Sequence, residues 1–114
     1  QVGGIANGKK VAMGGFQTVI LLSDGTLKTC GQNNSNYNNL GNAAFNAANS
    51  GTTKTPHAQV VDNITNAIDI ESNASTVYVL LDNGSVQCFG QNNSGSCGAS
   101  SLGHATSPRI IDGL

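Results

Sequence analysis

The sequence has no tryptophan, only one methionine and two prolines, and few charged residues, and the shortage of charge excludes some partners. Only 10% of the residues are charged, and five Lys and Arg against six Asp and Glu give a formal net charge of −1. The five basic residues are scattered, whereas a nucleic-acid interface needs them clustered. No apolar run is long enough for a transmembrane helix. We therefore expect neither nucleic-acid binding nor membrane insertion.

The three cysteines, Cys30, Cys88 and Cys97, form no metal-binding motif, because no CxxC or closely spaced histidine pair accompanies them. Cys88 and Cys97 could bridge a short loop, which would imply an oxidising compartment. We favour the other interpretation, in which all three cysteines are partly buried free thiols. In either case one cysteine is left over, and Cys30 is the candidate.

Groups for catalysis are equally scarce. Asp69 and Glu71 point to the same side of an expected strand, and we interpret them as solvated strand charges rather than a catalytic pair. His57 and His104 have no second ligand at metal-binding spacing. No glycine-rich phosphate loop precedes a helix. The sequence thus predicts a protein without enzymatic activity, bound metal or cofactor.

Loop-forming polar residues are abundant instead. The 114 residues include 15 Asn, 15 Gly, 11 Ser and 9 Thr, nearly half of the chain. These residue types favour turns over helix interiors, and no apolar stripe with helical spacing lasts for three turns. The apolar residues, 38% of the total, are gathered into short runs. The chain is therefore expected to be one all-β domain with long polar loops.

One segment recurs 59 positions later without a gap. Residues 18–35 and 77–94 are identical at eight positions, among them the pairs Leu21 and Leu80, Gly25 and Gly84. The first unit is longer downstream, chiefly in residues 42–54. We place the first repeat at residues 10–66 and the second at 67–114, with residues 1–9 as an N-terminal arm or linker.

Each repeat predicts four short antiparallel strands. Residues 18–22 and 77–81 are apolar on both alternating faces, which suits strands covered on two sides. Asp24-Gly25 and Asn83-Gly84 predict two-residue hairpin turns with positive φ at both central positions. The expected strands are residues 11–13, 18–22, 27–30 and 60–61, then 68–70, 77–81, 86–89 and 110–111. Four such strands make one blade of a β-propeller.

The spacing of these motifs resembles the repeat of the regulator of chromosome condensation family. In the first unit the resemblance is carried by Gly14-Gly15-Phe16-Gln17-Thr18, Asp24-Gly25, Gly31-x-Asn33, Leu40-Gly41 and Pro56; in the second, by Asn83-Gly84, Gly90-x-Asn92, Gly95, Gly98 and Pro108. The family usually has His where this chain has Gln17 and Thr76, and an aromatic residue where it has Cys30. The resemblance implies a propeller that recognises proteins or surfaces. The best-known member promotes guanine-nucleotide exchange, but its contact residues have no counterpart here.

Two blades do not close a ring of four to eight. The C-terminus ends in register with the place where a strand like Val11–Met13 should begin, and neither repeat has a polar capping face. We therefore expect a homo-oligomer, with a trimer closing one six-bladed propeller favoured over a tetramer with eight blades. The alternative is two blades cut from a longer, seven-bladed protein. A start at Gln1 without Met suits a processed product or such a fragment.

The long uncharged loops at residues 33–39 and 42–53 are expected to carry recognition. Tyr37 is the predicted stacking platform, with amide groups around it as donors and acceptors. The predicted ligand-binding residues are Asn36, Tyr37, Asn38, Asn39, Phe45 and Asn46. We expect an extracellular, lectin-like adhesion module at a cell or virion surface, suited to a fibre tip and binding a cell-surface glycan or protein. The alternatives are a protein-regulatory propeller, acting as an exchange factor or enzyme inhibitor, and a structural subunit of an extracellular filament.

Overall fold

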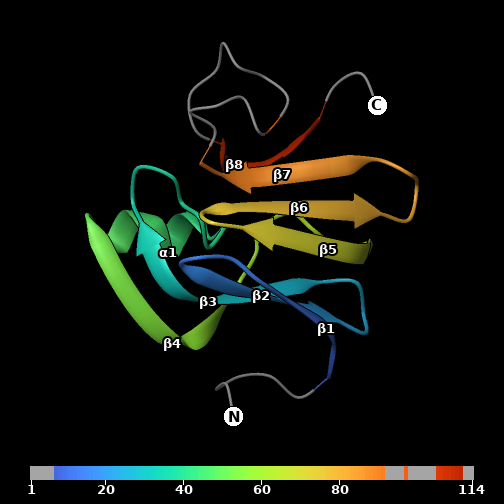
Figure 1. Cartoon of the computed structure of the whole chain (residues 1–114), viewed down its shortest axis with the longest axis horizontal. Coiled ribbons are helices and arrows are strands. Elements are labelled where there is room, and N and C mark those ends of the chain that lie inside the picture. Colours follow the sequence, from blue (N-terminus) through green and yellow to red (C-terminus); the bar gives the residue numbers. More distant parts are fainter. Residues whose placement is uncertain (1–6, 92–96, 98–104, 112–114) are drawn as a thin grey trace.

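Two four-stranded antiparallel sheets make up the computed structural model, which describes residues 7–91, 97 and 105–111 (Figure 1). The first sheet, which we call the first blade, contains β1 (Gly8–Met13), β2 (Gln17–Leu22), β3 (Leu27–Asn34) and β4 (Thr52–Val60) in that order. The second blade contains β5 (Ala67–Asn73), β6 (Thr76–Leu81), β7 (Val86–Gly90) and β8 (Ala105–Ile110). The predicted all-β fold with two antiparallel sheets is confirmed. The N-terminal arm, residues 1–9, lies mostly outside the described residues.

The sequence repeat reappears in the backbone. The pairing of β1 with β2 shifts register between Gly8 and Lys10, and the pairing of β5 with β6 shifts between Ala67 and Asp69. A second shift, between Thr29 and Gly31 opposite β4, recurs between Cys88 and Gly90 opposite β8. Both pairs of positions are 59 residues apart, so the two blades share their irregularities as well as their strands.

The hairpin turns differ from the prediction. The N–H of Gly25 donates to the carbonyl of Leu22, and the N–H of Leu22 donates to the carbonyl of Thr26, which closes a three-residue loop. Leu81, Gly84 and Ser85 make the same bonds in the second blade. Only the glycine of each loop has positive φ, +86° at Gly25 and +87° at Gly84. The prediction of two-residue turns is wrong. Each hairpin loop has three residues, and the glycine is the third of them.

The expected loop between β3 and β4 contains a short helix, α1 (Ala43–Ala48). Asn42 caps it, because its side-chain oxygen accepts a hydrogen bond from the N–H of Phe45 at 2.9 Å. With six residues, α1 is far too short to cross a bilayer, and no other helix occurs in the described part of the chain. Downstream, β4 includes Pro56 and lies at a sheet edge, where its missing N–H removes no essential bond.

The main core lies in the seam, the contact surface between the two blades. Val19, Leu21 and Leu27 form the front face of the first blade, and all three are buried. Val77, Val79 and Leu81 form the back face of the second blade and belong to the same apolar cluster. Because 77, 79 and 81 correspond to 18, 20 and 22 by the 59-residue offset, the seam joins unlike faces of equivalent strands.

The back face of the first blade is only partly covered, since Ile20 and Leu22 on it are buried but the apolar side chains of its outer strands are exposed. Its apolar side chains Val11, Met13 and Val60 are 58%, 71% and 50% exposed. Ile70, which occupies the position of Val11 in the second blade, is only 1% exposed because the first blade covers it. The same sequence position is therefore buried or exposed according to whether a neighbouring blade is present.

A disulfide joins Cys88 in β7 to Cys97, with their Cα atoms 5.6 Å apart. Both cysteines are buried and pack against Tyr78 and Ile111. The favoured interpretation of three free thiols is thus wrong, and the alternative pairing of Cys88 with Cys97 is confirmed. Cys30 is the leftover free cysteine, as expected, and burial raises the pKa of its thiol.

Candidate functional site

The loops that carry the predicted site meet at one edge of the two blades, which we call the loop edge. It is formed by residues 14–16 between β1 and β2, residues 35–51 between β3 and β4, and residues 74–75 between β5 and β6. A hollow of about 290 Å³ opens there, and we call it the seam hollow. Among the described residues its lining is uncharged: Phe16, Gln32, Asn34, Tyr37, Asn39, Ser75 and Gln91.

Asn39 holds the wall of the seam hollow together. Its side-chain nitrogen donates to the carbonyl of Gln32 at 2.8 Å and to the side-chain oxygen of Gln17 at 3.0 Å. Its side-chain oxygen accepts from the N–H of Asn34 at 2.8 Å. Asn39 is 1% exposed, and these three bonds use its amide within the protein. The Asn39 side chain therefore stabilises the loop by hydrogen bonds within the protein.

Gln17 extends this network across the seam. Its side-chain nitrogen donates to the hydroxyl of Ser72 in β5 at 2.8 Å. Beside it, the N–H groups of Gly15 and Phe16 donate to the carbonyl of Ala74 at 2.9 and 3.3 Å. The position at which the resemblance expects histidine is therefore occupied by a buried amide that ties the two blades together.

The structure brings two of the six predicted site residues, Tyr37 and Asn39, into the seam hollow. Asn36 is exposed beside it, and its N–H donates to the side chain of Asn34 at 2.9 Å. Asn38 is buried, with φ of +47°. That any of the six contacts a ligand stays a prediction.

Phe45 and Asn46 lie on α1 and do not line the seam hollow. The side-chain oxygen of Asn46 accepts from the side chain of Asn33 at 2.7 Å, and its nitrogen donates to the carbonyl of Ser35 at 3.1 Å. These bonds fasten α1 to the end of β3. Asn46 therefore stabilises the loop and does not line the seam hollow.

Sequence reasoning missed Phe16, Gln32 and Asn34 as site residues. Phe16 is 50% exposed, an unusual position for a ring among the described residues. It lies in the same motif that indicated the repeat, directly before Gln17. Gln32 and Asn34 lie in the segment that recurs in the second repeat, and a recurring segment can also present its side chains to a site.

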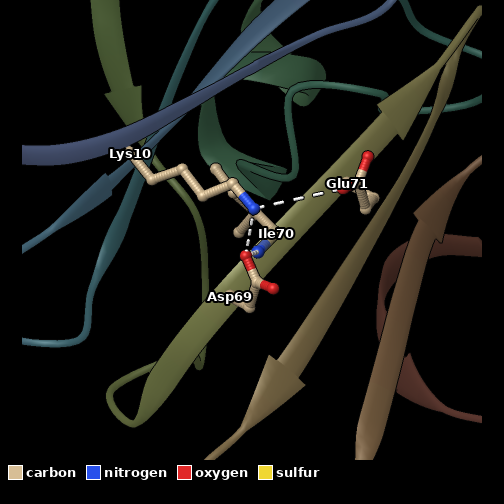
Figure 2. A network of polar contacts seen from close by, with 4 residues as sticks. All are labelled: Lys10, Asp69, Ile70 and Glu71. Atoms are coloured by element: carbon tan, nitrogen blue, oxygen red, sulfur yellow. Dashed lines mark hydrogen bonds and ion pairs between the residues drawn. The ribbon is translucent and has the colours of Figure 1, made fainter.

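A small charged cluster crosses the seam between β1 and β5. Lys10 of β1 reaches over to β5, where its ammonium group hydrogen-bonds to Asp69 and lies 4.0 Å from the carboxylate of Glu71 (Figure 2). The hydrogen bond from Lys10 lowers the pKa of Asp69, and the same bond raises the pKa of Lys10. All three side chains are substantially exposed. The expected strand charges thus form an ion-paired link between the blades.

This link makes stability depend on pH. A carboxyl whose pKa is lowered by folding stabilises the protein above its unfolded-state pKa, and this contribution is lost as the pH falls through the folded-state value. We expect Asp69→Asn to reduce the free energy of unfolding slightly at about pH 7, and we expect this deficit to shrink at acidic pH as the Asp69 carboxyl becomes protonated. Urea denaturation of both proteins at each pH measures this. A deficit of the variant that persists in full at acidic pH would contradict the role of the ion pair.

Within residues 7–91, 97 and 105–111, no group of three His, Cys, Asp or Glu side chains is placed to hold a metal ion. No curated protein matches the sequence at a significant level.

Solved structures resemble the chain closely in fold. Yeast RCC1 (Prp20) bound to Kap60 matches with a TM-score of 0.79 and 16% identity over 94% of this chain. Prp20p from Saccharomyces cerevisiae, studied for its binding to Gsp1p and histones, matches with a TM-score of 0.82 and 15% identity over 100%. Human WBSCR16 matches with a TM-score of 0.71 and 12% identity over 95%. The chain covers only 25%, 27% and 26% of these structures' own length.

These neighbours overturn the expected extracellular adhesion module. The yeast protein binds other proteins, which favours the alternative of a protein-regulatory propeller over a lectin-like fibre tip with a glycan ligand. The location at a cell or virion surface is wrong for the same reason. It was inferred from abundant amides displayed on loops, whereas Gln17, Asn39 and Asn46 use their amides for bonds inside the protein.

The homotrimer, with the tetramer as its variant, is also contradicted. In the neighbouring structures the two-blade unit matches one part of a single longer chain, not a separate subunit. Apolar side chains outside the seam are exposed, and a blade that covers them need not come from a further copy of this chain.

The sequence itself identifies the repeat. Residues 9–36, which span β1, β2 and β3, match the family model of the regulator of chromosome condensation (RCC1) repeat. The structural neighbours are RCC1 β-propeller proteins, to which both blades align. The chain therefore carries the RCC1-type repeat, folded as two antiparallel blades of that propeller architecture.

Proposed function

We propose that this chain is the two-blade part of a regulatory propeller that acts by binding another protein and not by catalysis. The observation that carries the proposal is the likeness of both blades, over 94% and 100% of the chain, to the yeast protein that binds Kap60, Gsp1p and histones. The loop edge supports it, since loops on a rigid scaffold are the usual place for recognition. The titratable side chains of the seam support it as well, because Asp69 and Glu71 are engaged with Lys10.

We further propose that blades of the same type cover the two faces left open outside the seam. The exposed Val11 and the buried Ile70 occupy equivalent positions, and only a covering blade distinguishes them. On the other side, Tyr78, Leu80 and Val86 are partly exposed, whereas their equivalents Val19, Leu21 and Leu27 are buried. A propeller ring supplies such a neighbour on both sides.

Site-specific photo-cross-linking tests the proposed function. A photoreactive phenylalanine analogue replaces Asn36, which is exposed at the loop edge, and in a matched control it replaces Lys9, which is exposed near the start of β1, at the end of that strand away from the loop edge. In extract of the source cells, we expect a discrete protein adduct from position 36 and none from position 9. The purified partner should then change activity when the protein is added. Absence of any protein adduct at position 36, with the protein folded by circular dichroism, would contradict the proposal.

A further inference from the structure

The seam hollow has features that the proposed function does not explain. It lies where two blades meet and draws its lining from both, with Ser75 and Gln91 contributed by the second blade. Its volume of about 290 Å³ is near the lower limit of small-ligand pockets. A hollow of this size takes a short stretch of chain rather than a folded surface.

Polar groups in the hollow are available for a ligand. Gln32 uses its main-chain N–H and carbonyl for bonds to Phe16 and Asn39, but its side-chain amide bonds to nothing in the part of the chain that the structure describes. The side-chain oxygen of Asn34 accepts a hydrogen bond from the N–H of Asn36, and its side-chain nitrogen bonds to none of the described residues. A primary amide offers a donor and an acceptor together, which matches the N–H and carbonyl of a peptide backbone.

The spacing of these amides favours an extended ligand. Gln32 and Asn34 are two residues apart at the end of β3, and both line the hollow. Alternate residues of a strand lie about 7 Å apart on one face. An extended peptide repeats its own backbone groups at the same distance, so the two amides can engage every second residue of such a chain.

The ring of Phe16 supplies the apolar contact. It is half exposed at the rim, while its backbone is fixed by bonds to Ala74 and Gln32. An aromatic ring on a fixed backbone has only two side-chain torsions to order, so it binds an apolar side chain at a modest entropic cost. No described residue lining the hollow is charged, so a charged side chain would lose its hydration there without gaining a counterion.

We propose that the seam hollow binds a short, extended and uncharged peptide segment of the partner protein, with Gln32 and Asn34 on its backbone and Phe16 on an apolar side chain. This inference rests on the proposed function, since it names the segment by which the partner is recognised. The size of the hollow, the Gln32 amide and the Asn34 side-chain nitrogen, an exposed ring and the absence of charge among the described lining residues agree on this one occupant.

Blocked heptapeptides, acetylated and amidated to remove terminal charges, are the probe. An array compares uncharged sequences with the same sequences carrying one Lys or one Asp, and fluorescence anisotropy measures the affinity of the strongest binder. We expect uncharged peptides to be retained and single charges to weaken binding. Equal or better binding of the charged members would overturn the proposal, and so would the absence of any bound peptide.

Two matched pairs of variants locate the binding. Phe16→Ala should weaken it about tenfold, as for a central aromatic contact, whereas Phe45→Ala removes a ring outside the hollow and should change it less than about twofold. Gln32→Glu, which keeps the shape but adds a charge, should weaken uncharged peptides and strengthen the lysine-containing ones. Gln59→Glu on β4 makes the same change elsewhere and should do neither. Equal effects within either pair would overturn the assignment.

The two proposals can fail separately. If position 36 cross-links a partner whose affinity is unchanged by Phe16→Ala, the peptide site is wrong and the proposed function stands. If uncharged peptides bind in a Phe16-dependent way while no partner protein is cross-linked, the site is right and the proposed function is wrong.

Discussion

Alanine at Gly25 is expected to destabilise the protein much more than alanine at Gly84, although the two glycines occupy equivalent turns. Their φ angles are +86° and +87°, so the cost of a left-handed backbone, about 1 kcal/mol or slightly more, is the same at both. A Cβ at Gly25 would lie 2.6 Å from the carbonyl oxygen of Thr65, whereas a Cβ at Gly84 would meet nothing within 4 Å. We expect losses of about 3 kcal/mol or more for Gly25→Ala and about 1 kcal/mol for Gly84→Ala.

Urea denaturation of the two variants and the parent protein measures the difference. Gly84→Ala is the internal control, because it makes the same substitution in the same turn of the other blade. Similar losses for both variants would mean that the segment around Thr65 does not press on the first blade, and the described seam would then be incorrect at that point.

Phe89→Ala is expected to cost about 3–5 kcal/mol of unfolding free energy. Phe89 is fully buried and belongs to the apolar cluster of the seam. Its ring fits against Gly41 so closely that a Cβ there would lie 2.8 Å from it, with Val61 alongside. Truncation would leave a cavity that the two sheets are unable to fill without moving together.

The same truncation at Phe16, which is half exposed, provides the comparison. We expect Phe16→Ala to cost less than about 1 kcal/mol, because about half of the residue is already exposed to water. Thermal or urea unfolding of the two variants distinguishes them. If Phe89→Ala were no more destabilising than Phe16→Ala, the seam would not be the core of the molecule.

The strands and their grouping into two sheets were predictable because the same pattern of strand and turn residues occurs twice in the sequence. The segment around Leu21-Leu22 recurs around Leu80-Leu81, and apolar residues on both alternating faces indicated strands covered on both sides. This logic requires only local pattern and one internal comparison. It placed six of the eight strands well, whereas the expected strands at residues 60–61 and 110–111 overlap β4 (Thr52–Val60) and β8 (Ala105–Ile110) by only one residue each.

Features that depend on hydrogen bonds between distant segments were not predictable. Helix α1 is held by the cap at Asn42 and by the bonds of Asn46 to Asn33 and Ser35, and none of these shows as an apolar pattern. The turn type was missed because Asp24-Gly25 is compatible with a two-residue or a three-residue loop.

The seam hollow was only half predictable. Tyr37 stood out as an aromatic residue in a long polar loop, and the structure does place it in the lining. Ser75 comes from the other blade, and its proximity depends on how the sheets pack. A single amide such as Asn39 carries no mark in the sequence that separates a bond inside the protein from one to a ligand.

Because the front of one blade fits the back of the next, the stacking has a polarity, and an added unit fits in one orientation only. Each repeat already carries the apolar side chains that an added blade would contact, because Val11 is exposed and the equivalent Ile70 is buried by the neighbouring blade. Duplication of one segment of the gene would therefore lengthen the array without redesigning any joint. Such a molecule can change its number of blades over evolutionary time while its loops diversify independently.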